Sequence, residues 1–205
     1  MFCTALDELI QALNQLPGVG PKSAQRMAFH LLDEKNKHKG LSLSSTLESS
    51  LQNIHHCDTC RIYTDRDRCQ ICSSEKRQDN TLCIVESPQD VFAIEQTHSY
   101  RGKYFVLHGR LSPLDGVGPA ELGIDQLKKL LANPNLNEVI LATNATVEGQ
   151  ATAHYLANLL RPGLKCSQIA QGIPLGGELE YLDGGTLSLA LQCRTHINTN
   201  EPVES

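Results

Sequence analysis

Four cysteines constrain the fold of this chain more than any other feature of its 205 residues. They form two Cys-x-x-Cys pairs separated by eight residues, and each pair can place two thiolates on one edge of a tight turn. The polar stretch between the pairs is too short to bury a core, so a bound metal ion would have to supply the folding energy. We therefore predict one structural zinc site whose four ligands are Cys57, Cys60, Cys69 and Cys72.

Two alternatives for these cysteines are weaker. A pair of disulfides requires an oxidising compartment, whereas the chain begins without a signal-peptide pattern, which predicts a reducing cytosol. A redox centre of the thioredoxin type has a single Cys-x-x-Cys within a βαβ unit. His55 and His56 could compete as ligands, but four sulfurs already complete a closed shell, which favours a structural metal. The other cysteines are predicted to pack as small apolar residues: Cys3, Cys83, Cys166 and Cys193.

The first 53 residues are predicted to be helical. Apolar residues at helical spacing predict a helix over residues 5–16, a second helix that starts at Pro21, and a third from Leu43 to Ile54. The polar residues 33–40 are predicted to form a loop. The buried stripe of the second helix would consist of Ala24, Met27, Ala28, Leu31 and Leu32.

The turn between the first two helices has the properties of a phosphate-binding site. Gly18 and Gly20 can adopt positive φ and leave backbone N–H groups uncovered at a helix N-terminus, where the helix dipole favours an anion. Lys22 and Arg26 lie four residues apart, on one face of that helix and near the same end. An ordinary helical hairpin with solvated basic side chains is the alternative. The combination favours contact with DNA phosphates, which positions a backbone without reading bases.

From residue 80 onward, strand-like and helical segments alternate, which predicts a mainly parallel sheet with helices on both faces. Ser87, Pro88 and Asp90 have the pattern of a capped helix start. Near the C-terminus, residues 178–182 are predicted to be a strand, and a final short helix is predicted to begin near Thr186. The other expected strands are 82–86, 104–107, 138–143 and 166–170, and the other expected helices are 125–132 and 148–160.

Carboxylates at the C-terminal ends of parallel strands point into the crevice where ligands usually bind. Glu86 has such a position, and the segment ATNATVEGQ follows another buried strand. This layout resembles the Toprim domains of topoisomerases, primases and some nucleases, in which that segment has the form ATD-x-D-x-EGE. Here Asn144 and Thr146 replace both aspartates while Glu148 remains, so the charged oxygens that bind Mg²⁺ are missing. A metal role for Glu86 and simple stabilisation by the dipole of the following helix are equally good explanations.

Catalysis is disfavoured for a second reason. The sequence has neither a nucleophile paired with a base nor a phosphate-binding loop of the G-x-x-x-x-G-K-[ST] type.

The composition is that of an ordinary soluble globular protein, with 40% hydrophobic residues and no apolar run of membrane-spanning length.

The formal net charge of −5 is unusual for a nucleic-acid-binding protein. Residues 176–205, however, contain five acids and one base, so this segment accounts for four of the five charges. Residues 1–53 contain five acids and five bases and are neutral. A local basic face on the second helix is therefore compatible with the overall charge.

Taken in order, these features resemble the RecR family of bacterial recombination proteins over residues 5–195. The resemblance is specific in the segments LPGVGPKSAQRMAF, CIVESPQD, YFVLHGRLSPLDGVGP, VILATN and GGELE. It implies a non-enzymatic DNA clamp in recombinational DNA repair that acts with RecO and RecF to promote RecA loading on gapped or single-stranded DNA. It also implies a homo-oligomer, a tetrameric ring formed by exchange of terminal elements. Such a protein would bind single- and double-stranded DNA without sequence preference and would be cytoplasmic and nucleoid-associated.

Residue roles follow from the same resemblance. By matching position, Lys22 and Arg26 would contact DNA together with Gly18 and Gly20. An acidic Toprim face that contacts RecO would include Glu86, Asp90 and Glu148. Gln150 stands where the family is expected to have a glutamate, and this replacement weakens the acidic face. The alternative function is a Mg²⁺-dependent Toprim enzyme that nicks or relaxes DNA with Glu86.

The predicted fold is a multidomain α/β protein. A helix–hairpin–helix region at 1–53 is followed by a four-cysteine zinc finger at 54–79. A Toprim domain with a mainly parallel sheet follows at 80–175, and a C-terminal strand–helix tail at 176–205 would serve in oligomerisation.

Overall fold

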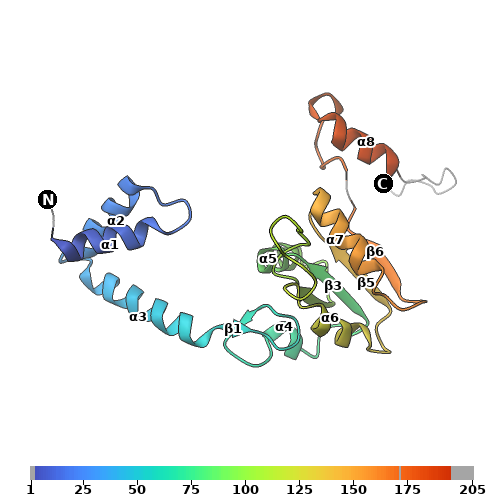
Figure 1. Ribbon diagram of the computed structural model, residues 1–205, viewed down its shortest axis with the longest axis horizontal. Coiled ribbons are helices and arrows are strands. Elements are labelled where there is room, and N and C mark those ends of the chain that lie inside the picture. Colours follow the sequence, from blue (N-terminus) through green and yellow to red (C-terminus); the bar gives the residue numbers. More distant parts are fainter. Residues whose placement is uncertain (1–2, 171, 195–205) are drawn as a thin grey trace, which may run out of the picture. The chain divides into compact units, whose positions relative to one another are not determined.

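The computed structural model describes residues 3–170 and 172–194, and the chain divides into two compact units, 1–54 and 55–205. The first unit consists of three helices: α1 (Thr4–Asn14), α2 (Pro21–Leu32) and α3 (Lys37–Asn53) (Figure 1). All three were predicted, but α3 begins six residues before Leu43, so the second half of the predicted loop is helical. The first turn of α3 forms at Asn36, whose carbonyl oxygen accepts hydrogen bonds from Lys39 N at 2.8 Å and Gly40 N at 3.1 Å.

The first unit buries little of its apolar surface. Of the predicted stripe on α2, only Ala24 and Ala28 are fully buried, whereas Met27 and Leu32 are 42% and 49% exposed. The prediction that these two larger residues are buried is wrong for the single chain. Three short helices enclose only the small residues where they touch, and they leave an apolar hollow of about 890 Å³ at the surface of the unit. Leu13, Leu16, Met27 and Leu43 are among the residues that line it.

A four-stranded parallel sheet forms the centre of the second unit. Its strands are β3 (Thr81–Val85), β4 (Lys103–Val106), β5 (Glu138–Ala142) and β6 (Lys165–Gln168), in the order β4-β3-β5-β6. Cys83 in β3 lies between Tyr104 of β4 and Ile140 of β5. The apolar runs of β3, β4 and β5 have the composition of strands that are covered on both faces.

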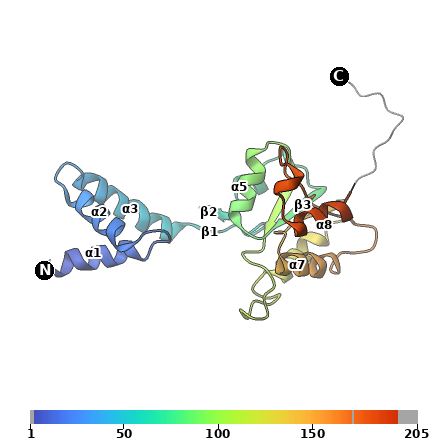
Figure 2. The same cartoon turned by 90° about the horizontal axis from the view of Figure 1, so that it is seen from above.

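Helices cover both faces of this sheet, as predicted. They are α5 (Pro88–Gln96), α6 (Ile124–Leu131) and α7 (Val147–Ala157). On one face, α6 and α7 share a core with Ile84, Phe105 and Leu141. On the other face, Val91 of α5 packs with Tyr104, and Figure 2 shows α5 and α7 on opposite sides of β3. The capping box of α5 is confirmed, since Ser87 N donates to Asp90 Oδ2 at 2.8 Å and Asp90 N donates to Ser87 Oγ at 3.4 Å.

The four-cysteine segment packs on the same face of the sheet as α5. It contains β1 (His55–His56), β2 (Tyr63–Thr64) and the short helix α4 (Gln70–Ser73), with β1 and β2 antiparallel. Its cysteines share a buried cluster with Cys83 and Tyr104, so the segment belongs to the second unit. The division of the chain into four domains stays a prediction.

The C-terminal segment differs from the prediction. Residues 178–182 do not form a strand: Leu179–Tyr181 is a 3-10 helix, η1, in which Tyr181 N donates to Glu178 O at 3.2 Å. These N–H groups are satisfied locally because no strand lies beside them among the described residues. The final helix is confirmed as α8 (Gly184–Gln192), capped by Asp183, and none of its residues is buried. Residues 195–205 of the predicted tail lie outside the described part of the chain.

Of the scattered cysteines, Cys83 is buried as predicted. Cys3, Cys166 and Cys193 are exposed, so the prediction that they pack as apolar residues is wrong for the single chain. Among the described residues, no helix combines the length and the apolar character required to cross a membrane.

Candidate metal centre and nucleic-acid interface

The four predicted cysteine ligands come together in one buried cluster. Their sulfur atoms all lie within 4.8 Å of one another, and Cys60 Sγ is 3.5 Å from Cys69 Sγ. Four sulfurs bound to a tetrahedral metal ion at about 2.3 Å would be about 3.8 Å apart, so the cluster has the dimensions of a metal site. Soft thiolates favour metals such as zinc. The described cysteines are free thiols rather than disulfides.

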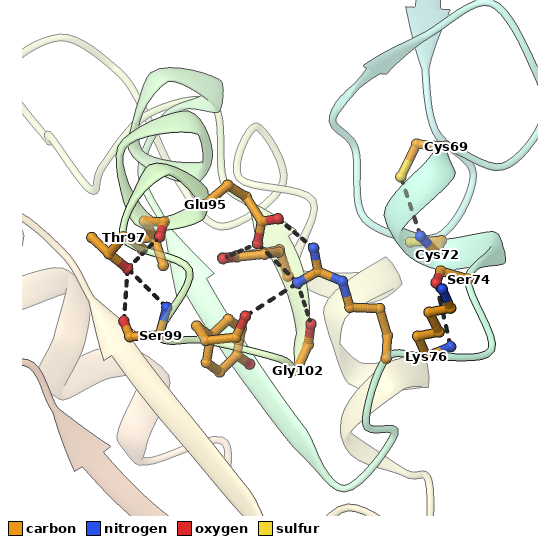
Figure 3. Close-up of polar contacts among 12 residues, drawn as sticks. Cys69, Cys72, Ser74, Lys76, Glu95, Thr97, Ser99 and Gly102 are labelled. Carbon is orange, nitrogen blue, oxygen red and sulfur yellow. Dashed lines mark hydrogen bonds and ion pairs between the residues drawn. The ribbon is translucent and has the colours of Figure 1, made fainter.

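The backbone around the cluster stabilises negative charge on sulfur. Cys69 N donates to Cys57 Sγ at 3.3 Å, and Cys72 N donates to Cys69 Sγ at 3.4 Å, the contact drawn in Figure 3. Hydrogen bonds from the Cys60 and Cys72 thiols lower the pKa of Cys69 to about 2, while the pKa of Cys60 is raised by the same contacts and by burial. These contacts favour the thiolate form of Cys69, which is the form of cysteine that binds a metal ion.

Arg61, directly after the first cysteine pair, joins this segment to the sheet. It has a φ of 64°, which turns the chain back so that its guanidinium reaches the loop between β4 and α6. Nη1 donates to the carbonyl oxygens of Leu107, at 3.2 Å, and Leu122, and Nη2 donates to that of Glu121 at 3.2 Å. The guanidinium occupies the space where a side chain at Gly123 would lie. We call this set of backbone contacts the Arg61 latch.

A second contact supports the latch from the opposite direction. His108 Nε2 donates to the carbonyl oxygen of Arg61 at 2.6 Å, and the His108 ring stacks on His56 with centroids 4.2 Å apart. Val106 N also donates to Cys60 O at 2.9 Å. The four-cysteine segment and the β4–α6 loop are therefore held together on both sides of Arg61.

The start of α2 has the features expected of a phosphate site. Gly18 has a φ of 78°, whereas Gly20, the N-cap of α2, has a φ of −83°, so only Gly18 uses the predicted positive φ. No side chain caps α2, which leaves backbone N–H groups of its first turn open to a ligand. Lys22 and Arg26 are both exposed, one helical turn apart. The arrangement can bind an oxyanion through amides, dipole and cations together.

The Toprim-like acid Glu86 is buried rather than presented to a ligand. Its side chain lies at the end of β3 and is 5% exposed. Asn144 donates to both carboxylate oxygens, from its backbone N to Oε1 at 2.8 Å and from Nδ2 to Oε2 at 2.7 Å. Gly149 in the first turn of α7 lies so close that a Cβ there would be 2.9 Å from Glu86 Oε1 and would collide with the carbonyl oxygen of Asn144. The carboxylate is therefore enclosed by the loop that follows β5.

Comparison with known proteins agrees with this architecture. Sequence models of three domains match the chain: a RecR helix–hairpin–helix at residues 6–51, a Toprim domain at 80–170 and a RecR C-terminal domain at 172–195. The recombination protein RecR of Coxiella burnetii is 56% identical over 201 residues, which cover 98% of this chain and all of that protein. The chain belongs to the RecR family. The RecR proteins of Xanthomonas axonopodis and Saccharophagus degradans are 54% and 52% identical, over 95% and 96% of this chain and 98% and 100% of their own lengths.

Within this RecR fold, the three acids assigned to a partner-binding face have different surroundings. Glu148, in the first turn of α7, is exposed, whereas Asp90 is half-buried and its carboxylate accepts the capping hydrogen bond from Ser87 N. Glu86 lies beside the same turn of α7 but is enclosed. Whether these residues bind a partner stays a prediction, and of the three Glu148 is the most open to solvent.

The sequence alone did not indicate two residues whose contacts hold this structure together. Asn144 was interpreted only as a lost metal ligand, but it is also the donor that satisfies Glu86. Arg61 was not singled out, because its acceptors are backbone carbonyls 46 to 61 residues away. The one available signal was its position directly after a Cys-x-x-Cys pair, where a charged side chain must leave a buried cluster.

Proposed function

We propose that this protein is a non-enzymatic DNA-binding clamp that serves in recombinational DNA repair. It would bind single- and double-stranded DNA without sequence preference and act with RecO and RecF to promote RecA loading. Membership of the RecR family supports the role in recombination, since the relatives carry the name recombination protein RecR. A cytoplasmic, nucleoid-associated location is part of the same proposal.

The observation that carries the proposal is the open N-terminus of α2. Its glycine N-cap offers no side-chain oxygen to the first-turn amides, and Lys22 and Arg26 stand beside them. Phosphate is the group that these donors fit best, because it accepts several hydrogen bonds and carries the opposite charge. The glycines also leave open space around them, which lets a ligand approach the backbone.

The test is DNA binding by the full-length Lys22→Ala, Arg26→Ala variant. We expect its affinity to fall about tenfold and its salt dependence to weaken, because each lost phosphate contact removes a released counterion. A matched control is Lys128→Ala, Lys129→Ala, which removes the same charge from the exposed surface of α6. If the α2 variant binds DNA as tightly as the wild type, the assignment of α2 is wrong.

The metal of the four-cysteine cluster is proposed to be one structural zinc ion. Four sulfur ligands leave no open position for substrate, and the Arg61 latch gives the ion a mechanical role in holding the β4–α6 loop. Metal analysis of the purified protein should find one zinc per chain, and a protein that folds normally without zinc would contradict this proposal.

The contacts of Glu86 argue against the alternative, a Mg²⁺-dependent Toprim enzyme. Both of its oxygens accept hydrogen bonds from Asn144, and a metal ion would have to displace that amide. Nicking or relaxation of supercoiled DNA that requires Mg²⁺ and disappears in Glu86→Gln would overturn the non-enzymatic assignment.

A tetrameric ring is the proposed assembly. The apolar hollow of the first unit and the unburied helix α8 support association between copies, because exposed apolar surface favours contact with another chain, while the number four and the ring are what the family resemblance implies. The charge-inserting substitution Leu43→Glu lies in the hollow and should lower the mass measured by light scattering. The same substitution at Leu114, which is fully exposed in the second unit, should not. An unchanged mass for Leu43→Glu would contradict a role of the hollow in assembly.

RecO is proposed to bind the acidic Toprim face through Glu148. Asp90 caps α5 and Glu86 is enclosed, so reversing either charge would disturb folding as well as binding. Glu148→Arg should weaken RecO binding and leave DNA binding unchanged. Asp125→Arg, a charge reversal at an exposed position on α6, should leave both unchanged. RecO binding that is unaffected by Glu148→Arg would contradict this proposal.

A further inference from the structure

A positively charged hollow lies in the unit that contains the sheet. It has a volume of about 380 Å³ and opens between the segment after α4, the end of α5 and the turn before β4. The residues that line it are Lys76, Arg77, Glu95, His98, Tyr100 and Arg101.

An ion pair between Arg77 and Glu95 forms the base of this hollow. Arg77 Nη1 donates to Glu95 Oε1 at 2.8 Å, and Nη2 pairs with the other carboxylate oxygen (Figure 3). Nη1 also faces the carbonyl oxygens of Tyr100 and Gly102 at 3.4 Å, and Tyr104 Oη donates to Glu95 Oε1 at 2.7 Å. The guanidinium lowers the pKa of Glu95, so both groups stay charged and neutralise each other.

The cations around this base are not neutralised. Lys76 and Arg101 are exposed, and neither side chain forms a hydrogen bond or ion pair within the described part of the chain. His98 follows the end of α5 with a φ of 54°, a left-handed conformation that ends the helix and places the residue at the rim of the hollow. Among the described residues that line the hollow, Glu95 is the only one with a carboxylate, and it is already paired with Arg77. Lys76 and Arg101 therefore give the hollow an excess of two positive charges, on a chain whose net charge is −5.

This excess fits an oxyanion of phosphate size. Lysine and arginine together bind phosphate through charge-assisted hydrogen bonds, and Lys76 and Arg101 line the hollow from different segments of the chain. We propose that the hollow is a second phosphate-binding site, which takes a backbone phosphate of the same nucleic acid that α2 binds. This inference rests on the proposed function and adds a contact on the other compact unit.

Two phosphate sites on two units make the protein a bivalent ligand for DNA. An oligonucleotide that is too short to reach both sites would gain from only one of them. A longer one would gain from both, because binding at the first site raises the effective concentration of phosphate at the second. Affinity should therefore rise with length in a step that depends on Lys76 and Arg101.

The experiment measures binding of full-length protein to labelled thymidine oligonucleotides of increasing length, each at several salt concentrations. For Lys76→Gln, Arg101→Gln we expect about a tenfold loss of affinity for long oligonucleotides, no loss for short ones, and a salt slope reduced by about 0.7, the value for one phosphate of a single strand. Lys128→Gln, Lys129→Gln removes the same charge from α6, on the opposite face of the sheet, and should bind like the wild type. The exchange Lys76→Arg, Arg101→Lys keeps both charges and should keep the salt slope.

The outcomes separate this site from the α2 site. If the Lys76, Arg101 variant binds every length like the wild type, or if the α6 control loses as much affinity, the second site is refuted while α2 stands. If this variant loses affinity but Lys22→Ala, Arg26→Ala does not, the α2 assignment fails instead. Inorganic phosphate and thymidine monophosphate serve as competitors. If either one displaces the contact at a concentration comparable to the concentration of oligonucleotide phosphate, the ligand is a free phosphate and the backbone assignment is wrong.

Discussion

Asn144 holds the buried Glu86 carboxylate, and the substitution Asn144→Asp should convert that contact from attraction to repulsion. The amide nitrogen lies 2.7 Å from Glu86 Oε2, and the Asn144 backbone N lies 2.8 Å from Oε1. An aspartate in the same rotamer would put a carboxylate oxygen where the Nδ2 donor now lies. This is also the residue type found there in metal-dependent Toprim motifs, so the variant tests what the asparagine contributes.

The magnitude follows from the spacing. Two carboxylates whose charges are centred about 4 Å apart repel by about 4 kcal/mol at an effective dielectric constant near 20. Two acids this close relieve the repulsion when one of them takes up a proton. The free-energy cost of that protonation falls by about 1.4 kcal/mol for each unit by which the pH is lowered. We therefore expect the variant to lose about 4 kcal/mol of unfolding free energy near pH 8. Because the folded variant binds more protons than the unfolded chain, the deficit should shrink to about 2 kcal/mol or less near pH 5.5.

The assay is urea denaturation of wild type, Asn144→Asp and Asn144→Ala at both pH values, with and without Mg²⁺ or Mn²⁺. The alanine variant removes the donor without adding a charge, so its loss of about 2 kcal/mol should be nearly the same at both pH values and in both metals. A divalent cation should stabilise only the aspartate variant, because only that variant offers two carboxylates. The reasoning is refuted if Asn144→Asp is as stable as the wild type near pH 8, or if its deficit is the same at the two pH values.

Three further predictions concern the metal site, α7 and the Arg77 ion pair. Cys69→Ser should be purified without zinc and with a lowered melting temperature, and a variant that retains one zinc per chain would show that the cluster is not the site. Gly149→Ala should lower the free energy of unfolding measured in urea by about 2 kcal/mol, because the added methyl group meets the carbonyl oxygen of Asn144. Gly184→Ala, at a position with open space around it, should lower it far less. Equal losses for the two variants would contradict the packing argument. Since the pKa of Glu95 is lowered from 4.5, the stability it adds is present above pH 4.5 and is lost as the pH falls through the lowered value. Glu95→Gln should therefore have a lower free energy of unfolding at neutral pH, and this free energy should depend less on pH in acid. If the pH dependence is the same as in the wild type, the Glu95–Arg77 ion pair does not contribute to stability in this way.

The elements that sequence analysis predicted correctly depend on local chemistry. The capping box at Ser87 and Asp90 and the two cysteine pairs need only residues a few positions apart. The parallel sheet was predictable because apolar runs such as 82–86 are long enough to be buried on both faces. The helices on both faces followed from the alternation of these runs with helical segments, whereas the Toprim assignment rested on the resemblance of Glu86 and of residues 142–150 to that family.

The elements that were predicted wrongly depend on what surrounds them. Residues 178–182 have the composition of a strand, but a strand needs a neighbour, and without one they form the 3-10 helix η1. Met27 and Leu32 have helical spacing appropriate to a buried stripe, yet three short helices do not cover them. Arg61 could not be assigned its acceptors from the sequence, because every backbone carbonyl looks the same until the chain is folded.

The Arg61 latch affects which substitutions this protein can accept during evolution. All of its acceptors are main-chain oxygens, so the guanidinium recognises the path of the β4–α6 loop and is indifferent to the side chains that the loop displays. Substitutions at outward positions such as Leu114 can therefore accumulate without loosening the four-cysteine segment, whereas no neutral side chain can replace the arginine. The surface that the loop presents to a partner can therefore change in sequence while the hydrogen bonds of Arg61 to the loop backbone stay the same.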